Sequence, residues 1–387
     1  MAITDKKTGP WGLDQVYNKI NQGSIWDYTG QGHLYSWGNN TNGRLGVNSQ
    51  TKYSSPIQIP GAWGPSSIVR VADGVYSVKT DGTLWTWGRN QARLGHNDTT
   101  ARSSPVQVPG TTWSEPGTAG DSGACTKTDG TLWIWGLDNN GQLAQNNQTQ
   151  YSSPKQIPGT TWSRVSGGDG WYIALKTDGT LWAWGENAQG QLGQNNKTQR
   201  SSPIQIPGTT WSDIGCQRDS SWAMKTDGTL WAWGKNTDGQ LGQNNKTEYS
   251  SPRQVGSDTT WSKLGVFPPQ SGAQCIATKT DGTLWVWGGA GDYGILCNGG
   301  VGDSFNRSSP VQIPGTNWST TIRPHIESNC ASAVKTDGTG WVWGRNDDGI
   351  LGQNQPSNTH RSSPVQLPGT WLDLMVTSAA SFGIKPG

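Results

Sequence analysis

Short apolar stretches alternate with polar turns along most of the chain, and the same order of stretches recurs. In the clearest copy, residues 162–210, the run Tyr-Ile-Ala-Leu-Lys is followed by Thr-Asp-Gly-Thr and then by Leu-Trp-Ala-Trp-Gly. Asp-Gly between two apolar runs is a strong hairpin signal, because both residues tolerate positive φ. The two Trp of the second run lie two residues apart, so their side chains share one face of a strand. The pattern predicts short antiparallel strand pairs.

The unit occurs seven times. The string Trp-x-Trp-Gly, or a near copy of it, ends at Gly38, Gly88, Gly136, Gly185, Gly234, Gly288 and Gly344. Each unit also contains a run of the form Pro-x-Gln-x-Pro-Gly, or a variant of it, and prolines at both ends suit a short edge strand. Three or four short strands per unit, repeated at nearly constant spacing, predict an all-β fold, a seven-bladed β-propeller.

Tryptophan replaces the usual aliphatic core in this chain, which contains 24 Trp among 387 residues. We expect the paired Trp of the repeat to be structural, because large aromatic side chains on one strand face pack against the next sheet. These residues are Trp85, Trp87, Trp133, Trp135, Trp182, Trp184, Trp231, Trp233, Trp285, Trp287, Trp341 and Trp343. The most recognisable part of the sequence is therefore assigned to the scaffold.

The repeat is out of phase with the ends of the chain. Residues 381–385 are similar to the second strand of the unit, so we expect the C-terminal segment to supply the first strands of the blade completed by residues 33–59. Such closure removes exposed sheet edges. The alternative is that residues 25–28 fill one of these positions. We assign residues 25–387 to the propeller.

Residues 1–24 form an N-terminal extension outside the repeat. Apolar residues spaced by three and four predict one face of a short helix. With a nearby Trp they are candidate anchor residues: Trp11, Leu13, Val16, Tyr17 and Ile20. A helix this short needs a surface to lie on. That surface is either another subunit or the propeller itself.

The unit resembles the repeat of the regulator of chromosome condensation family. The string from Trp184 to Gly193, Trp-Gly-Glu-Asn-Ala-Gln-Gly-Gln-Leu-Gly, carries the resemblance and recurs from Trp233 to Gly242. The resemblance covers roughly residues 30–387 and implies seven blades. It implies no single function, because the family includes exchange factors, enzyme inhibitors, photoreceptors and binding modules.

The loops before each Lys-Thr-Asp-Gly turn differ most between repeats, and binding sites commonly lie in such loops. By repeat symmetry they share one face and surround a central channel. We predict a binding surface there, with solvated turns as the alternative. Its candidate residues are Asp169, Trp171, Arg218, Asp219, Trp222, Phe267, His325 and Glu327. An exposed Trp rim of this kind would suit stacking on sugars.

Composition and motifs exclude several classes of function. The net charge is +2 with no basic run, which argues against nucleic-acid binding, and no apolar run is long enough to span a membrane. We find no nucleophile, phosphate-loop or metal motif, so we predict a non-enzymatic protein without cofactors or metal. The five Cys (125, 216, 275, 297 and 330) and the absence of a secretory signal predict free thiols in a protein made in a cytoplasm.

Two functional hypotheses remain. Near-identical repeats of low charge behind a short anchor favour an attachment module of a virion, a tailed-phage component of capsid, tail or fibre. Its partners would be other structural subunits and a surface glycan or receptor. The alternative is a soluble cytoplasmic propeller that binds and regulates a protein partner through its variable loops.

Overall fold

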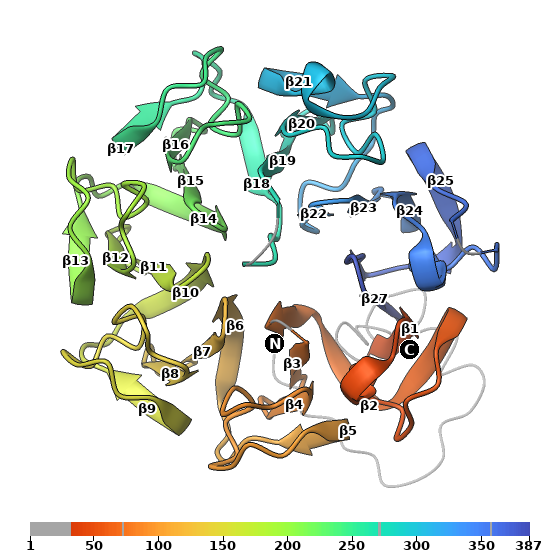
Figure 1. Cartoon of the computed structure of the whole chain (residues 1–387), viewed down its shortest axis with the longest axis horizontal. Coiled ribbons are helices and arrows are strands. Elements are labelled where there is room, and N and C mark those ends of the chain that lie inside the picture. Colours follow the sequence, from red (N-terminus) through yellow and green to blue (C-terminus); the bar gives the residue numbers. More distant parts are fainter. Residues whose placement is uncertain (1–31, 72, 270–271, 357) are drawn as a thin grey trace, which may run out of the picture.

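The computed structural model describes residues 32–71, 73–269, 272–356 and 358–387. Six hydrogen-bonded sheets surround a central axis (Figure 1), five with four strands and one with seven. The seven-stranded sheet contains two blades, because the long strand β2 (Tyr53–Val71) pairs with β1 (Gly32–Gly38) through its first half and with β3 (Gly74–Lys79) through its second half. The structure therefore has seven blades, as predicted.

We number the blades I to VII along the chain, beginning with the blade that contains β1. Blade II comprises the second half of β2 with β3, β4 (Leu84–Gly88) and β5 (Arg102–Gln107). Blade III comprises β6 (Trp113–Ala119), β7 (Ser122–Lys127), β8 (Leu132–Gly136) and β9 (Tyr151–Ile157). Blade IV comprises β10 (Trp162–Gly167), β11 (Trp171–Lys176), β12 (Leu181–Gly185) and β13 (Arg200–Ile206). Blade V comprises β14 (Trp211–Gln217), β15 (Ser220–Lys225), β16 (Leu230–Gly234) and β17 (Tyr249–Gln254). Blade VI comprises β18 (Trp261–Leu264), β19 (Gln274–Lys279), β20 (Leu284–Gly288) and β21 (Arg307–Ile313). Blade VII comprises β22 (His325–Glu327), β23 (Cys330–Val334), β24 (Thr339–Gly344) and β25 (Arg361–Thr370).

The C-terminal segment closes the ring, as the sequence predicts. Strands β26 (Asp373–Met375) and β27 (Ala380–Pro386) are the two inner strands of blade I, and β27 pairs with β1 from Gly32 opposite Pro386 to Gly38 opposite Ala380. The alternative closing residues 25–28 and the N-terminal extension 1–24 lie outside the described residues.

The Thr-Asp-Gly turns are stabilised locally, which confirms that the recurring Asp belongs to turn chemistry. In blade IV the Asp178 carboxylate accepts hydrogen bonds from the backbone N–H and the hydroxyl of Thr180, at 2.9 and 2.7 Å. These two bonds lower the pKa of Asp178. The Thr180 hydroxyl in turn accepts a bond from the indole N–H of Trp182, at 3.0 Å. The turn and the first paired Trp thus form one unit.

The second paired Trp of every blade joins that blade to the preceding one. Its indole N–H donates to a backbone carbonyl in the neighbouring loop at 2.7–2.9 Å, and Trp233 to Gln191 is representative. A second repeated contact occurs in six of the seven blades. The backbone N–H of the Trp that opens the blade's innermost segment donates to the Gly carbonyl of the preceding Asp-Gly turn, as from Trp211 to Gly179. The motif therefore specifies contacts between blades as well as within them.

One glycine of the repeat is required by close packing between blades. Gly190 has φ +78°, and a Cβ there would lie 2.6 Å from the side chain of Ser250 in the next blade. Its counterpart Gly239 meets Ser308 in the same way. The Gly-Gln-Leu-Gly string of one blade therefore packs against the Ser-Ser-Pro string of the next blade.

Lysine side chains cover the paired aromatic residues at the other end of each blade. The Lys176 ammonium lies 4.6 Å from the ring centroids of both Trp162 and Trp182, within cation–π range. The arrangement recurs in all seven blades, with Tyr35 replacing one Trp in blade I. The structural role predicted for the paired Trp agrees with these contacts.

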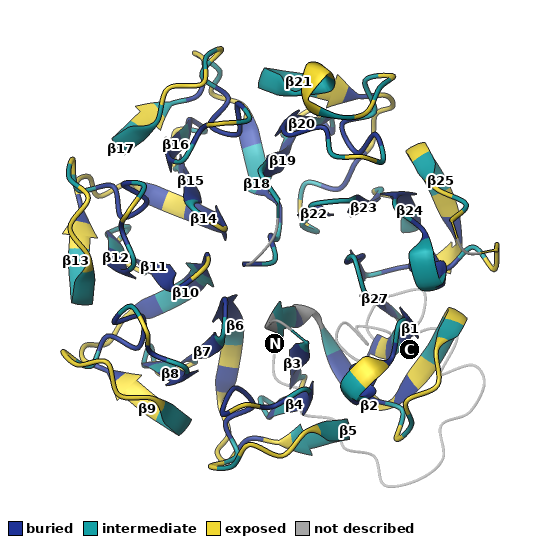
Figure 2. Cartoon of the chain, in the orientation of Figure 1, coloured by how far each residue is buried: buried dark blue, intermediate teal, exposed yellow. Residues whose placement is uncertain are grey.

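Buried residues occupy the inner and middle strands, whereas the outermost strands are more exposed (Figure 2). The five Cys are free thiols, as predicted, and all but the half-buried Cys297 are buried. Short 3₁₀ helices lie at Thr41–Gly43, Asp303–Phe305 and Asp347–Gly349. Nowhere in the described ranges is there a helix with the length and apolar character needed to cross a membrane.

Candidate binding face

Two sets of loops lie together on one face of the propeller. In each blade, a backbone N–H just after the Trp-Gly string donates to the loop between the first two strands, as from Glu186 to Gly170 at 3.0 Å. We call this side the loop face and the opposite side, with the Thr-Asp-Gly turns, the turn face. The variable loops of the sequence are therefore on one face, as repeat symmetry predicts.

Acidic side chains gather on the loop face across blades III to V. Asp169 is exposed, and Asp121, Glu186 and Asp219 are half-buried around it. Burial raises the pKa of Asp169, and the charges of Asp219 and Asp121 raise it further. Burial also raises the pKa of Glu186, with Asp219 and Asp169 contributing. We name these four residues the acidic cluster. Asp121 pairs with Arg93 at 2.7 Å and Asp219 with Lys235 at 3.6 Å, whereas Asp169 and Glu186 form no ion pair with a described residue.

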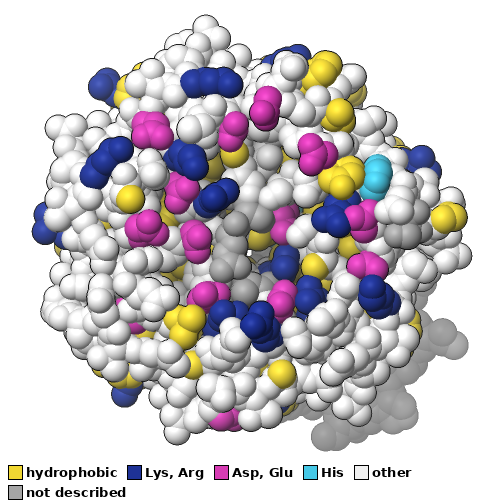
Figure 3. Space-filling view, in the orientation of Figure 1, with side chains coloured by type: hydrophobic (Ala, Val, Ile, Leu, Met, Phe, Trp, Pro, Cys, Tyr) yellow, Lys and Arg dark blue, Asp and Glu magenta, His cyan; other side chains and the backbone are white. Residues whose placement is uncertain are grey.

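Arginines form a complementary region beside the acidic cluster, over blades I and II. Three guanidinium groups surround Asp73: those of Arg44 at 3.2 Å, Arg70 at 3.7 Å and Arg89 at 3.7 Å. Arg70 also pairs with Glu327 at 3.2 Å, so three cations meet two carboxylates and one positive charge is left in excess. Burial lowers the pKa of Arg44. Figure 3 shows acidic and basic side chains gathered around the central axis on the face that it views. The loop face thus has two regions of opposite charge.

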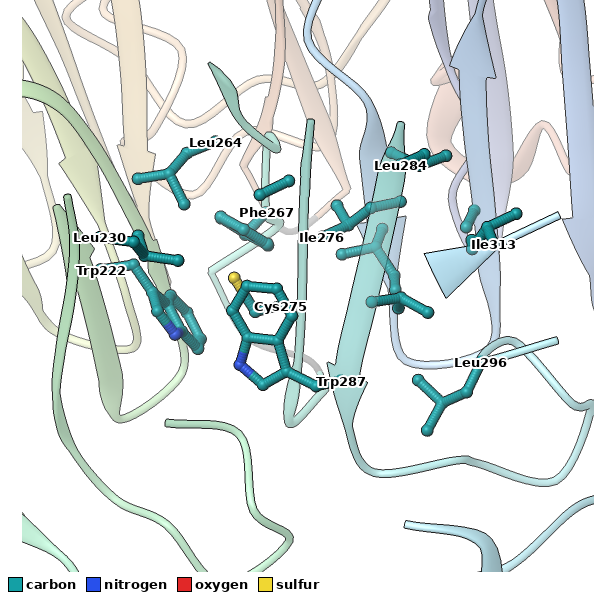
Figure 4. Close-up of a cluster of buried hydrophobic side chains, with 14 of the residues drawn as sticks. Trp222, Leu230, Leu264, Phe267, Cys275, Ile276, Leu284, Trp287, Leu296 and Ile313 are labelled. Atoms are coloured by element: carbon teal, nitrogen blue, oxygen red, sulfur yellow. The ribbon is translucent and has the colours of Figure 1, made fainter. Parts of the chain in front are cut away.

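The aromatic candidates predicted for this face are buried, so the expected exposed Trp rim is wrong. Trp171 and Trp222 are 0% exposed, and their indole N–H groups donate to the carbonyls of Arg218 and Gln240. Phe267 packs against Trp222 with ring centroids 5.1 Å apart, in the cluster between blades V and VI (Figure 4). These side chains fill space between blades because they belong to strands or pack directly on them.

His325 and Glu327 are also buried, on the innermost strand of blade VII. His325 lies 3.5 Å from Asp373. Glu327 accepts hydrogen bonds from Ser378 and pairs with Arg70 at 3.2 Å. Both residues therefore contribute to closure of the ring and present no exposed surface on the loop face.

The charged candidates are at the surface. Arg218 and Asp169 are exposed and Asp219 is half-buried, and the backbone N–H of Asp169 donates to the carbonyl of Arg218 at 2.9 Å. The structure therefore brings Asp169, Arg218 and Asp219 together on adjacent loops. The candidate anchor residues Trp11, Leu13, Val16, Tyr17 and Ile20 lie outside the described residues.

Sequence reasoning missed the residues that directly follow each Trp-Gly. Arg89, Glu186 and Lys235 occupy this position in blades II, IV and V, and Lys235 lies 3.6 Å from Asp219. A signal was present, because this position changes between Arg, Glu, Lys, Leu, Gly and Asn within an otherwise constant string. The residue that varies within the repeated Trp-Gly string therefore indicates the loop face, just as the variable loops between the strings do.

The described residues contain no group of three or more His, Cys, Asp or Glu arranged to hold a metal ion. The prediction of a non-enzymatic protein remains a prediction.

Fold and loop geometry together define a seven-bladed propeller with a charged, variable loop face. The model of the RCC1-like domain matches residues 78–384, and the model of the regulator of chromosome condensation (RCC1) repeat matches residues 31–78. The chain belongs to the RCC1-like family. A comparison with curated proteins finds no match.

Solved structures of similar fold include two cellular proteins. Human WBSCR16 is 18% identical, with a TM-score of 0.77 over 92% of this chain and 99% of that one. Prp20p from Saccharomyces cerevisiae is 15% identical, with a TM-score of 0.75 over 92% of this chain and 91% of that one. A structure of Kap60 bound to yeast RCC1 (Prp20) gives 15% identity and a TM-score of 0.77, covering 99% and 95% of the two chains. At these identities the likeness shows the fold alone.

Proposed function

We propose that this chain is a non-enzymatic propeller that binds and regulates a protein partner through its loop face. The observation that carries the proposal is the acidic cluster, which lies where the repeats differ most. Burial raises the pKa of its members Asp169 and Glu186, and the like charges of neighbouring carboxylates raise it further. A cationic segment of a partner would relieve this repulsion, and paired potentials of opposite sign steer association. The arginines around Asp73 offer a second contact, to acidic groups of the same partner.

The similar structures support this class of function. The crystal structure of Prp20p was described together with its binding properties to Gsp1p and histones, and Prp20 is also seen bound to Kap60. These are properties of Prp20. They favour partner binding over the virion hypothesis, which the matches do not support. A surface glycan as ligand likewise has no support from these matches, and the predicted aromatic rim that motivated it is buried.

The test is charge reversal within the acidic cluster. We expect the double variant Asp169→Lys, Glu186→Lys to fold but to lose a partner that the wild-type chain captures from extracts of its own source, identified by mass spectrometry. Glu248→Lys is the matched control, because Glu248 forms a surface ion pair with Lys197, at 3.5 Å, in the loops before the outer strands β17 and β13. A lysine-rich peptide titrated at two salt concentrations provides a direct measurement. Equal capture and equal peptide binding by wild type and the double variant would refute the proposal.

A further inference from the structure

A groove lies between the outer parts of blades IV and V, which are neighbours in Figure 1. It has a volume of about 330 Å³, within the range of ligand-binding clefts. Blade IV contributes Asn195 and Pro207 to its lining, and blade V contributes Trp211, Lys225 and Trp231. Trp211 begins β14 and Lys225 ends β15, so both lie at the turn-face ends of their strands. We call this space groove IV–V, and it is remote from the acidic cluster on the loop face.

Groove IV–V contains a positive charge without a carboxylate partner. Among the described residues that line it, Lys225 alone is charged. The Lys225 ammonium lies 5.0 Å from the ring centroid of Trp211 and 4.2 Å from that of Trp231, and it forms no ion pair with a described residue. Asp227 lies nearby in the chain, but its carboxylate accepts hydrogen bonds from the backbone N–H and the hydroxyl of Thr229, at 3.0 and 2.7 Å. A ligand that carries a carboxylate would therefore complement the charge of the groove.

The rest of the lining offers apolar surfaces and free polar groups. Trp231 is half-buried and Pro207 is exposed, so apolar ring surface is accessible to a ligand. The side chains of Asn195 and Ser251 line the groove and make no hydrogen bond with a described residue. The backbone N–H of Asn195 donates to the carbonyl of Ser250 at 2.7 Å, which holds this loop against blade V. Extended proline-rich chains fit such a lining, because their rings pack on aromatic surfaces and their carbonyls have no internal donors.

The next groove, between blades V and VI, is built from the same repeat positions but its charge is compensated. We call it groove V–VI, and its volume is about 480 Å³. Trp261 and Lys279 line it in place of Trp211 and Lys225. Asp258 also lines groove V–VI and forms an ion pair with Lys279. The two grooves therefore share a construction and differ in charge.

We propose that groove IV–V binds an extended, proline-rich segment of a partner protein through one acidic side chain of that segment, which pairs with Lys225. The prolines of the segment rest on Trp231 and Pro207, and Asn195 and Ser251 donate hydrogen bonds to its carbonyls. Groove V–VI does not bind the same segment, because Asp258 already pairs with Lys279 and repels an acid. This site has the opposite charge to the acidic cluster and lies at the other end of the strands, so it does not depend on the proposed function.

The experiment follows the indole N–H resonances of Trp211 and Trp261, one in each groove, by two-dimensional NMR while a peptide is added to the full chain. Residue-specific signals are needed because the contact between Lys and aromatic rings recurs in every blade. The probe is an acetylated and amidated peptide, Pro-Pro-Glu-Pro-Pro, and the same peptide with Gln in place of Glu is its reference. We expect a saturable shift of Trp211 and none of Trp261. Binding at Trp211 should be about fivefold weaker for the Gln peptide and for Lys225→Met.

Three further variants act as controls. Lys246→Met removes an exposed lysine from an outer loop of blade V and should bind the Glu peptide as wild type does. The double variant Asp169→Lys, Glu186→Lys should also bind it as wild type does, which separates this test from that of the proposed function. Asp258→Asn removes the carboxylate from groove V–VI and should make Trp261 respond to the Glu peptide.

The proposal is overturned if the Glu and Gln peptides shift Trp211 with equal affinity, a comparison that leaves the protein unchanged. It is also overturned if Lys225→Met keeps the wild-type affinity for the Glu peptide. Tighter binding of a glucuronate-containing oligosaccharide than of the Glu peptide overturns it as well, and would identify groove IV–V as a site for acidic sugars.

Discussion

The joint between blades III and IV differs from the junction where blades VII, I and II meet. The first is made by contacts that recur in every blade, with an indole N–H donating to a neighbouring carbonyl, as from Trp184 to Gln142. The second has these contacts and a buried ionic contact in addition, centred on Glu327. Blade I is assembled from both ends of the chain, so no hairpin connects β27 to β1. An added interaction at the point without covalent continuity offsets the larger entropy cost of closing the ring there.

The largest expected effect comes from breaking this closure contact. Glu327 of blade VII accepts the Ser378 hydroxyl and backbone N–H of blade I, at 2.6 and 2.9 Å, and pairs with Arg70 of blade II. Glu327→Gln keeps the shape but leaves Arg70 opposite a neutral amide, with only the 3.7 Å contact to Asp73, which Arg44 and Arg89 share. Because removal of one partner from a buried ion pair leaves a charge uncompensated, we expect a loss on the order of 3 kcal/mol in the free energy of unfolding, measured by urea denaturation.

Glu248→Gln is the control for this variant. The Glu248–Lys197 pair lies on the surface, where removal of such a pair costs about 1 kcal/mol or less. If the two variants lose similar stability, the closure junction has no special role and the regular joints alone hold the ring.

The comparison can also be made between two copies of the same regular joint. In blade IV, Asn187 accepts a bond from the Leu192 N–H at 2.9 Å and donates to the carbonyls of Asn196 and Thr198. Blade III has Asp138 at this position, which accepts from Leu143 at 3.2 Å, while its buried Oδ2 has no hydrogen-bond partner in the described residues. A carboxylate oxygen has replaced an amide donor.

Asp138→Asn should therefore stabilise the protein, by about 1 to 2 kcal/mol at neutral pH. Burial raises the pKa of Asp138 in the folded state, so the folded chain binds the proton more tightly than the unfolded chain. The stability of the wild type then falls as pH rises from about 4, the unfolded pKa, through the raised folded pKa. The gain from the substitution should accordingly be full at pH 7, shrink as the pH falls through the raised folded pKa, and reach its minimum below about pH 4. Denaturation of both proteins at pH 7 and pH 3.5 checks the sign, and a gain independent of pH would contradict it.

The sequence was sufficient to predict the blades and the closure, because both depend on local chemistry. In a β-propeller each of three sequence features predicts one structure: the Asp-Gly turns, the Trp residues two positions apart, and the copy of a strand sequence at residues 381–385. The charged candidates Asp169, Arg218 and Asp219 were also placed on the correct face. Their chain positions next to a turn were enough to fix this.

The buried candidates could not be assigned from the sequence alone, because their burial depends on the neighbouring blade. Trp171 begins β11, at a position where the other blades have smaller residues, and it reaches the loop of blade V to donate to Arg218. Glu327 is three residues from its strand partner but pairs with Arg70, 257 positions away. A single sequence shows that such residues differ from their counterparts in the other repeats. It does not show which residues of the neighbouring blade they contact.

The smallest expected effect concerns the same loop of blade III. Ala144 has φ +56°, whereas the equivalent residues in blades IV and V are Gly193 and Gly242, both at φ +68°. A left-handed conformation costs a residue with a Cβ about 1 to 2 kcal/mol, and glycine loses part of that advantage through its more flexible unfolded state. We expect Ala144→Gly to raise the free energy of unfolding by about 0.5 kcal/mol, measured in the Asp138→Asn background to improve precision. The reverse change, Gly193→Ala, should cost more than this gain, because its Cβ would lie 2.9 Å from Nε1 of Trp233 and disturb the joint to blade V. If the two reciprocal changes were equal and opposite, backbone strain alone would explain both, and the packing of this loop against the next blade's Trp would carry no energy.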